Sequence, residues 1–312
     1  MSSNSCASIL LLVWNRPDYV KILLDRIRLI RPTSLYVASD GPRSENSSDL
    51  HLINESRSLV NDLITWPCKV HLRYQSSNLG CRLHVSSAIT WFFDHNEYGI
   101  ILEDDCIPHP DFFPFATQLL KMYAGDTRIW SISADNRQPT ARCYDYTDSY
   151  YFSRFHHCWA WATWRRAWSH YSLNNDKFVG ISGPIALRPF LSFIQSIYWY
   201  DVWSSVFKYN SVDTWDYQWT FTCFLNNGMS IVPRRCLVVN IGFCASATHT
   251  TTGRSPLSHA PYFSEPSSLI PLVHPSLMQE NSIRDRYTFF KTYLRPYAMI
   301  LLILRYIRRS LL

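Results

Sequence analysis

The chain has 312 residues, of which 47% are hydrophobic and 17% charged, a composition typical of a packed globular body and not of a disordered chain. Its net charge of +6 comes from residues 281–312, where seven Lys and Arg accompany a single Asp, and the remainder holds 23 basic and 23 acidic residues. A body balanced in this way has no general basic face, so we expect no nucleic-acid partner. Nine cysteines, an odd number without a C-x-x-C pair, favour a reducing compartment over a disulfide framework.

The first 135 residues alternate short apolar runs with amphipathic segments, which indicates strands connected by helices. We predict strands, each rich enough in Ile, Leu and Val to be buried on both faces, at 8–14, 34–39, 69–74, 99–102 and 128–133. Helices are predicted at 18–30, 48–65, 81–95 and 111–123, the second beginning at a serine cap; a helix at 215–225 and strands at 229–232 and 237–240 follow. The predicted fold class is therefore α/β, a mixed, mainly parallel sheet flanked by helices.

Strand 99–102 is followed by three consecutive carboxylates, Glu103, Asp104 and Asp105. Ligands bind such sheets at the carboxyl ends of their strands. Like charges repel, so we expect a cation here, and all-oxygen ligands suit Mg²⁺ or Mn²⁺. The alternative is a solvated acidic turn that begins the next helix.

A divalent ion held by one or two protein carboxylates typically completes its shell with water and substrate phosphates, which points to a phosphorylated ligand. The chain has no G-x-x-x-x-G-K-[ST] and no G-x-G-x-x-G, which disfavours P-loop hydrolases and dinucleotide dehydrogenases. Backbone groups or arginines that follow predicted strands would then hold the phosphates; the arginines available are Arg16, Arg43, Arg82 and Arg137.

Several strand-end motifs occur together, in order along the chain: Val13-Trp14-Asn15-Arg16-Pro17, Ser39-Asp40-Gly41-Pro42-Arg43, Asn78-Leu79-Gly80, Ile101 to Asp105, Trp215-Asp216-Tyr217-Gln218-Trp219 and Ala247-Thr248-His249-Thr250. In these motifs residues 8–255 resemble the GT-A nucleotide-diphospho-sugar glycosyltransferases. The nearest resemblance is to the bacterial haemolytic-protein-HlpA-like group, which is related to N-acetylglucosaminyltransferase I. The acidic triplet and the Trp-Asp-Tyr-Gln-Trp element are the most specific parts.

The resemblance implies a bacterial hexosyl- or N-acetylhexosaminyltransferase of polysaccharide biosynthesis, dependent on Mn²⁺ or Mg²⁺. It implies that the nucleotide-sugar donor is bound by Asn15, Arg16, Pro17, Asp40, Arg43, Asn78, Arg82, Glu103 and Asp104. It implies Asp105 and His249 as metal ligands. The acidic triplet is Glu-Asp-Asp where the family has Asp-x-Asp, so which oxygens bind the metal directly stays open.

Asp216 is the residue we expect to act as general base, which predicts inversion at the anomeric carbon, because a carboxylate within hydrogen-bond reach of an acceptor hydroxyl can take its proton. The alternative for an aspartate at the start of a helix is capping. We expect Trp159, Trp161 and Trp215 to offer stacking faces to a glycan or lipid-linked acceptor, with core packing as the alternative.

The resemblance divides the chain into a catalytic domain at 1–255 and a linker with a basic amphipathic tail at 256–312. In the tail, the seven apolar residues 298–304 are too few to cross a bilayer, which needs about 20. With Arg305, Arg308 and Arg309 they suit the membrane interface, so we expect a cytoplasmic protein that touches the inner face of the membrane. A helix that docks on protein is the alternative.

Two other functions stay open. A sugar-phosphate nucleotidyltransferase also uses Mg²⁺, carboxylates and a similar sheet, but it usually has a glycine-rich basic loop where this chain has Asn15-Arg16-Pro17. A non-catalytic carbohydrate-binding protein built on the tryptophans would leave the acidic triplet without a role.

Overall fold

The computed structural model describes residues 6–139, 147–174, 176–242 and 269–294. Within these ranges the strands are β1 Ile9–Val13, β2 Ser34–Ser39, β3 Lys69–Tyr74, β4 Tyr98–Glu103, β5 Cys106–Pro108, β6 Ile129–Ser133, β7 Tyr150–Ser153, β8 Trp161–Trp164, β9 Met229–Pro233 and β10 Val238–Asn240. The helices are α1 Pro17–Ile30, α2 Ser47–Leu63, α3 Gly80–His95, α4 Phe112–Met122, α5 Arg165–Trp168, α6 Asp176–Val179, α7 Phe193–Phe207, α8 Asp216–Leu225 and α9 Ser282–Thr288. A 3-10 turn, η2 Pro184–Leu187, precedes α7, and a π-helical turn, η3 Phe289–Tyr293, follows α9.

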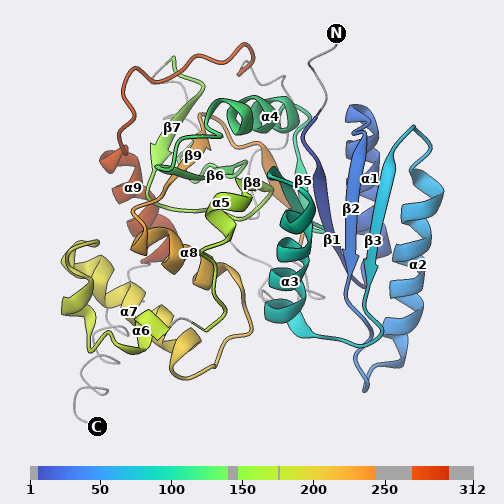
Figure 1. Cartoon of the computed structure of the whole chain (residues 1–312), viewed down its shortest axis with the longest axis horizontal. Coiled ribbons are helices and arrows are strands. Elements are labelled where there is room, and N and C mark those ends of the chain that lie inside the picture. The colour runs from blue at the N-terminus through green and yellow to red at the C-terminus, as the bar shows by residue number, and fades with distance from the viewer. Residues whose placement is uncertain (1–5, 140–146, 175, 243–268, 295–312) are drawn as a thin grey trace.

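The central sheet has the strand order β3-β2-β1-β4-β8-β6-β9-β7. Strands β3, β2, β1 and β4 are parallel to one another, and β6 is parallel to β9, whereas β8 is antiparallel to both β4 and β6. The result is a mixed, mainly parallel sheet flanked by helices (Figure 1), so the predicted α/β fold class is confirmed. The carboxyl ends of β1, β2, β3, β4 and β6 lie at the same edge of this sheet.

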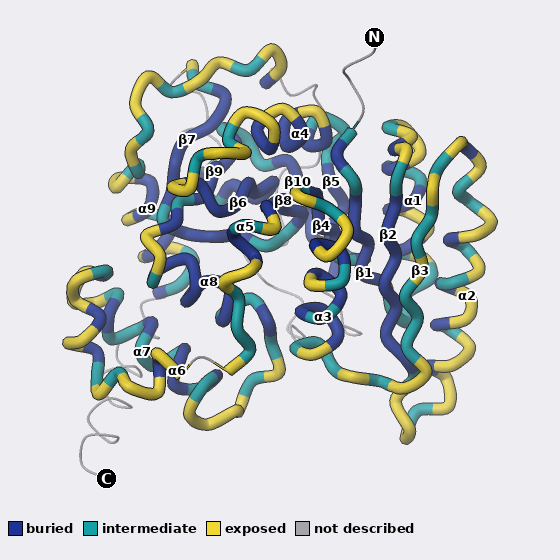
Figure 2. Tube along the Cα trace, viewed as in Figure 1, coloured by how far each residue is buried: buried dark blue, intermediate teal, exposed yellow. Residues whose placement is uncertain are grey.

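Alternation along the strands divides the core between the two faces of the sheet. In β1, Ile9, Leu11 and Val13 pack with α1, α2 and α4, while Leu10 and Leu12 pack with α3, α5 and α8. Figure 2 shows the strands in the middle of the sheet buried and the outer surfaces of α1 and α2 exposed. Buried on both faces, the central strands read in the sequence as unbroken apolar runs.

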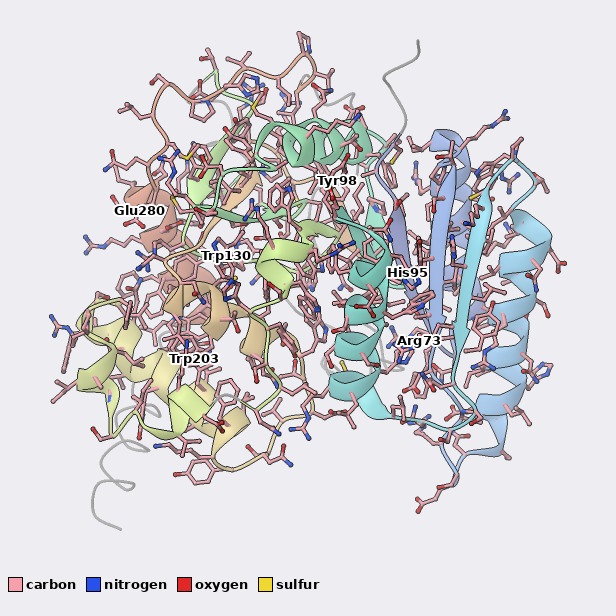
Figure 3. The ribbon with its side chains drawn as sticks, viewed as in Figure 1. Arg73, His95, Tyr98, Trp130, Trp203 and Glu280 are labelled. Atoms are coloured by element: carbon pink, nitrogen blue, oxygen red, sulfur yellow. The ribbon has the colours of Figure 1, made fainter. Side chains whose placement is uncertain are left out.

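A third apolar cluster lies outside the two sheet faces and joins α6, α7 and α8 to the π-helical turn after α9. Its largest members are aromatic, and Trp199 and Trp203 stack with ring centroids 5.1 Å apart. Figure 3 shows Trp203 among these rings, well separated from Trp130, which packs with the face of the sheet that α3 and α8 cover. Much of the high aromatic content is therefore core.

Two expectations are corrected in detail, and some elements were not expected. Strand β3 is at the sheet edge and none of its residues is buried, contrary to the expectation of burial on both faces. Helix α2 is capped by Asn46, whose side chain accepts from the backbone N–H of Ser48, and not by a serine. Strands β7 and β8 and helix α7 were not anticipated, because runs rich in Trp and Tyr carry no clear period of 2 or 3.6.

Residues 269–294 of the expected linker and tail pack on the body. Leu269 and Phe289 are buried, Phe152 and Glu280 form an isolated parallel bridge, and Asp285 accepts hydrogen bonds from Ser153 Oγ and the backbone N–H of Arg154. The boundary at 255/256 and the basic tail at 295–312 fall in or beside ranges outside the described residues and stay predictions. No helix in the described ranges is long and apolar enough to span a bilayer.

Strand β4 presents the acidic triplet, and its packing gives a first prediction. A Cβ on Gly99 would lie 2.2 Å from Phe92 Cζ and 2.8 Å from the carbonyl oxygen of Ser8. We expect Gly99→Ala to lower the free energy of unfolding by about 1–3 kcal/mol, the usual cost of overpacking, in urea denaturation. Gly125→Ala, whose Cβ would meet nothing within 4 Å, is the matched control. Equal stability of the two variants would contradict this packing.

Candidate active site

The acidic triplet lies at the edge where the parallel strands end. Glu103 is the last residue of β4, and Asp104 and Asp105 follow it beside the end of β1, where the backbone N–H of Trp14 donates to Asp104 Oδ2 at 3.1 Å. Arg16 bridges the two aspartates, with its NH1 3.2 Å from Asp104 Oδ1 and 3.2 Å from Asp105 Oδ2. The structure thus brings Arg16, from the expected donor-binding set, to the triplet.

A small second sheet positions Asp105. Strand β5 begins directly after it and pairs antiparallel with β10, opposing Asn240 to Cys106. The Asp105 carbonyl accepts from the backbone N–H of Ile241 at 2.8 Å, and Cys106 Sγ lies 3.3 Å from Asp105 Oδ1. A Cβ on Gly242 would come within 2.2 Å of Asp105 Oδ2, so only a glycine leaves the carboxylate in place.

Asp216 brings a fourth carboxylate to the triplet from a distant part of the sequence. It is the first residue of α8, and its Oδ1 accepts from the backbone N–H of Tyr217 at 2.9 Å and from Thr214 Oγ1. Its charge also raises the pKa of Glu103. Among the described residues no hydrogen bond to Asp216 Oδ2 is found, so this oxygen is left to accept a proton while Oδ1 orients the side chain.

Crowding of these carboxylates disfavours their full ionisation. Burial raises the pKa of Glu103 well above its usual value, and the charges of Asp105, Asp216 and Asp104 raise it further. Burial likewise raises the pKa of Asp104 to about 6, although Arg16 opposes the shift. A site that resists holding its own negative charge is one that a cation would stabilise.

The donor set fits a hard divalent cation. The groups that converge are carboxylate oxygens, the ligands preferred by Mg²⁺ and Mn²⁺. Over the described residues no group of three or more His, Cys, Asp or Glu side chains forms a preformed metal cage. The site therefore fits an ion that is held by one or two carboxylates, such as that of Asp105, and whose coordination shell is completed by water and substrate. The other expected ligand, His249, lies outside the described residues.

Asp40 organises the neighbouring loops. It directly follows β2, and its carboxylate accepts from the backbone N–H groups of Gly41, Leu79 and Gly80 and from Asn78 Nδ2, at 2.8 to 3.2 Å. These bonds join the loop after β2 to the start of α3, where a Cβ on Gly41 would come within 2.5 Å of the Ser77 backbone. Both oxygens of Asp40 are thus engaged within the protein, as is the Asn78 amide.

Asp49, a residue that the sequence did not single out, holds two of the expected donor-binding side chains. This fully buried carboxylate in the first turn of α2 accepts from Arg43 Nε at 2.7 Å and from Arg43 NH2 and Asn15 Nδ2 at 2.9 Å. The Arg43 guanidinium also lies over the Trp14 ring, 4.8 Å from its centroid. The loops after β1 and β2 are thereby fastened to α2. An acidic residue in a first helical turn is so common that the sequence offered no signal for this role.

The remaining expected donor-binding residues begin helices. Pro17 is the first residue of α1, where its missing N–H costs nothing. Arg82 is in the first turn of α3 and donates to the Asn210 side chain, while Asp213 accepts from the backbone N–H groups of Cys81 and Arg82. Whether these residues contact a donor stays a prediction.

The three tryptophans expected at the acceptor site differ in burial. Trp161 and Trp215 are 1% and 3% exposed and stack on each other, with ring centroids 5.5 Å apart, in the core beneath α3 and α8. Their environment favours the core-packing alternative. Trp159 is only partly buried and has the Arg137 guanidinium over its ring, 5.2 Å from the centroid. Of the three, Trp159 is the one with surface left for a ligand.

Comparison with known proteins gives only partial structural similarities. No family model matches the chain, and no curated protein matches it. The solved structures that resemble it include "Mannosyltransferase PcManGT from Pyrobaculum calidifontis in complex with GDP-Man and Mn2+" (TM-score 0.35, 14% identity, 53% of this chain and 46% of that one). TarS 1-349 from S. aureus has a TM-score of 0.40 and 9% identity, over 74% of this chain and 59% of that one. HddC from Yersinia pseudotuberculosis has a TM-score of 0.31 and 10% identity, over 51% of this chain and 77% of that one. This chain therefore covers less than half of the mannosyltransferase, and similarities at this level assign it no function.

The raised pKa of Asp104 predicts a pH dependence of stability. The folded value of about 6 exceeds the unfolded value of about 3.9, so the native state binds more protons between these limits. The contribution of Asp104 to stability is full below pH ~4 and is lost as the pH rises through ~6. Without divalent ions, we expect the wild type to lose up to about 3 kcal/mol relative to Asp104→Asn between pH 4 and pH 7.5.

Urea denaturation of both proteins at the two pH values measures this difference. Asp62→Asn, at an exposed aspartate of α2, is the control for removing a carboxylate away from the site. A constant difference between wild type and Asp104→Asn across this range would show that Asp104 ionises normally.

Proposed function

We propose that the chain is a glycosyltransferase that moves a sugar from a nucleotide-diphosphate donor to a hydroxyl of a glycan or lipid-linked acceptor. The observation that carries the proposal is the convergence of Asp216, with one carboxylate oxygen left for a proton, on the acidic triplet at the carboxyl edge of the sheet. The motif resemblance to GT-A enzymes supports it, with either a hexosyl or an N-acetylhexosaminyl group as the sugar transferred.

The aspartates then have different tasks. Asp105 lies where the diphosphate would bind, and Arg16 joins Asp104 to it. A Mn²⁺ or Mg²⁺ ion bound at Asp105 would supply Lewis-acid stabilisation of the diphosphate charge. Asp40, Asn78 and Asp49 act before any substrate arrives, because they fix the loops that line the nucleotide side of the site. Fixed loops lower the entropy cost of aligning two substrates.

Asp216 is the proposed general base. As the acceptor oxygen bonds to the anomeric carbon, its proton passes to Asp216 Oδ2. The bond from the anomeric carbon to the diphosphate oxygen breaks on the opposite side, and its electron pair leaves with the diphosphate. Attack from the face opposite the leaving group inverts the anomeric configuration. Hydrogen bonds from Thr214 and Tyr217 to Oδ1 keep the other oxygen directed at the acceptor.

Replacing the base tests its role. We expect Asp216→Asn to lower the transfer rate about 10²–10⁴-fold while donor binding is unchanged, because an amide still accepts the two Oδ1 hydrogen bonds but takes no proton. Release of nucleoside diphosphate from a panel of sugar nucleotides, with glycan acceptors, measures the rate. Asp176→Asn, at the first residue of α6, is the matched control for a helix-start aspartate. Loss of folding in Asp216→Asn, shown by thermal melting, would favour the capping role instead.

Metal removal is a second test. We expect a chelator to abolish donor hydrolysis and added Mn²⁺ to restore it. We expect Asp105→Asn to raise the Mn²⁺ concentration needed for half-maximal donor hydrolysis at least tenfold. Donor turnover that is indifferent to the chelator would rule out the proposed cation. Release of pyrophosphate from a nucleoside triphosphate and a sugar 1-phosphate would instead identify the alternative, a nucleotidyltransferase.

A further inference from the structure

Arg137, just after β6, is held in a single orientation. Its Nε donates to Asp135 Oδ2 at 2.8 Å, and the guanidinium carbon lies 5.2 Å from the ring centroid of Trp159 and 5.7 Å from that of Tyr293. Its side chain is 11% exposed and that of Asp135 only 6%. An ion pair at one edge and two aromatic rings fix the plane of the guanidinium.

The terminal nitrogens of Arg137 have no partner among the described residues. Its one hydrogen bond uses Nε, and both NH1 and NH2 keep some contact with solvent. Arg43 differs, because both its Nε and its NH2 donate hydrogen bonds to Asp49. Arg137 is therefore a partly buried guanidinium whose outer edge is available for hydrogen bonds.

Arg137 is connected to the proposed base by packed side chains and lies away from the nucleotide loops. The Tyr293 ring under its guanidinium has its centroid 5.4 Å from that of Trp199, and Trp199 lies 6.5 Å from the ring of Tyr217, the residue after Asp216. In agreement with this proximity, the pKa of Tyr217, which burial raises to about 12, is also raised by Asp216 and lowered by Arg137. Arg137 follows β6, which β8 separates from β4, whereas the loops fixed by Asp40 follow β2 and β3.

The two terminal N–H groups of an arginine form a planar fork that matches two oxygens of a phosphate or a carboxylate. A fork already oriented loses little conformational freedom on binding. We propose that Arg137 binds an anionic group, phosphate or carboxylate, carried by the acceptor. The proposal rests on the proposed transferase function and assigns a chemical class to its acceptor, which is a phosphate-bearing or acidic glycan.

Calorimetric titration of the full chain with inorganic phosphate, and separately with glucuronate, tests the site. We expect binding at one site that Arg137→Gln weakens at least tenfold and Arg137→Lys weakens less, since lysine keeps the charge but lacks the fork. The matched control is Arg166→Gln, because Arg166 also lies over a tryptophan, 4.5 Å from the Trp164 centroid, and uses Nε to bond a carbonyl. If Arg137→Gln unfolds because Asp135 is left unpaired, the double variant Asp135→Asn/Arg137→Gln removes both charges.

A second arm identifies which substrate supplies the anion. With Mg²⁺ and saturating UDP or GDP present, phosphate or glucuronate should still bind, since the acceptor and the donor diphosphate occupy different positions. Displacement by the nucleotide would assign Arg137 to the donor and overturn the proposal, as would equal affinities of wild type and Arg137→Gln, or no binding of either anion. Binding that depends on Arg137 in a chain that binds no nucleotide would overturn the transferase function but retain the anion site.

Discussion

Electrostatic repulsion among crowded carboxylates, one of them buried and three half-buried, is the constraint on which the site depends. Glu103, Asp104 and Asp105 follow one another at the end of β4, and Asp216 adds its charge from α8. Asp104 is buried and the other three are half-buried, so holding four charges together is costly, and Arg16, which bonds Asp104 and Asp105, offsets part of the repulsion. A bound cation would relieve this repulsion, and the cation would in turn attract phosphate groups.

Most of the polar residues around this centre serve the architecture first. Asp49 fastens Arg43 and Asn15 to α2, and Asp40 closes two loops on each other. Such internal pairing satisfies buried polar groups and makes the loops rigid before a substrate arrives. It also distinguishes Arg16 and Arg43, whose terminal nitrogens bind carboxylates, from Arg137, which bonds Asp135 through Nε alone.

The two halves of the sheet contribute different parts of the site. The parallel strands β1 to β4 provide the acidic triplet and the rigid loops, while β6, β8 and α8 provide Asp216, Arg137 and Trp159. Strand β8 joins the halves by pairing antiparallel with both β4 and β6. A reaction between two bound substrates would suit this division, because each half could hold one of them, with Asp216, the proposed base, where the halves meet.

The sequence by itself determined the α/β class and the strands β1, β2, β4 and β6, because buried parallel strands leave unbroken apolar runs. It also determined the helices between them, because surface helices leave a period of 3.6, and the position of β3, although not that β3 is an exposed edge strand. It also located Glu103, Asp104 and Asp105, because residues that follow such strands must meet at one edge. Only the tertiary structure decided that β8 is inserted between β4 and β6, that Trp161 and Trp215 are core, and that Asp49 claims Arg43. These outcomes depend on pairings between residues far apart in the chain, and local periodicity does not predict such pairings.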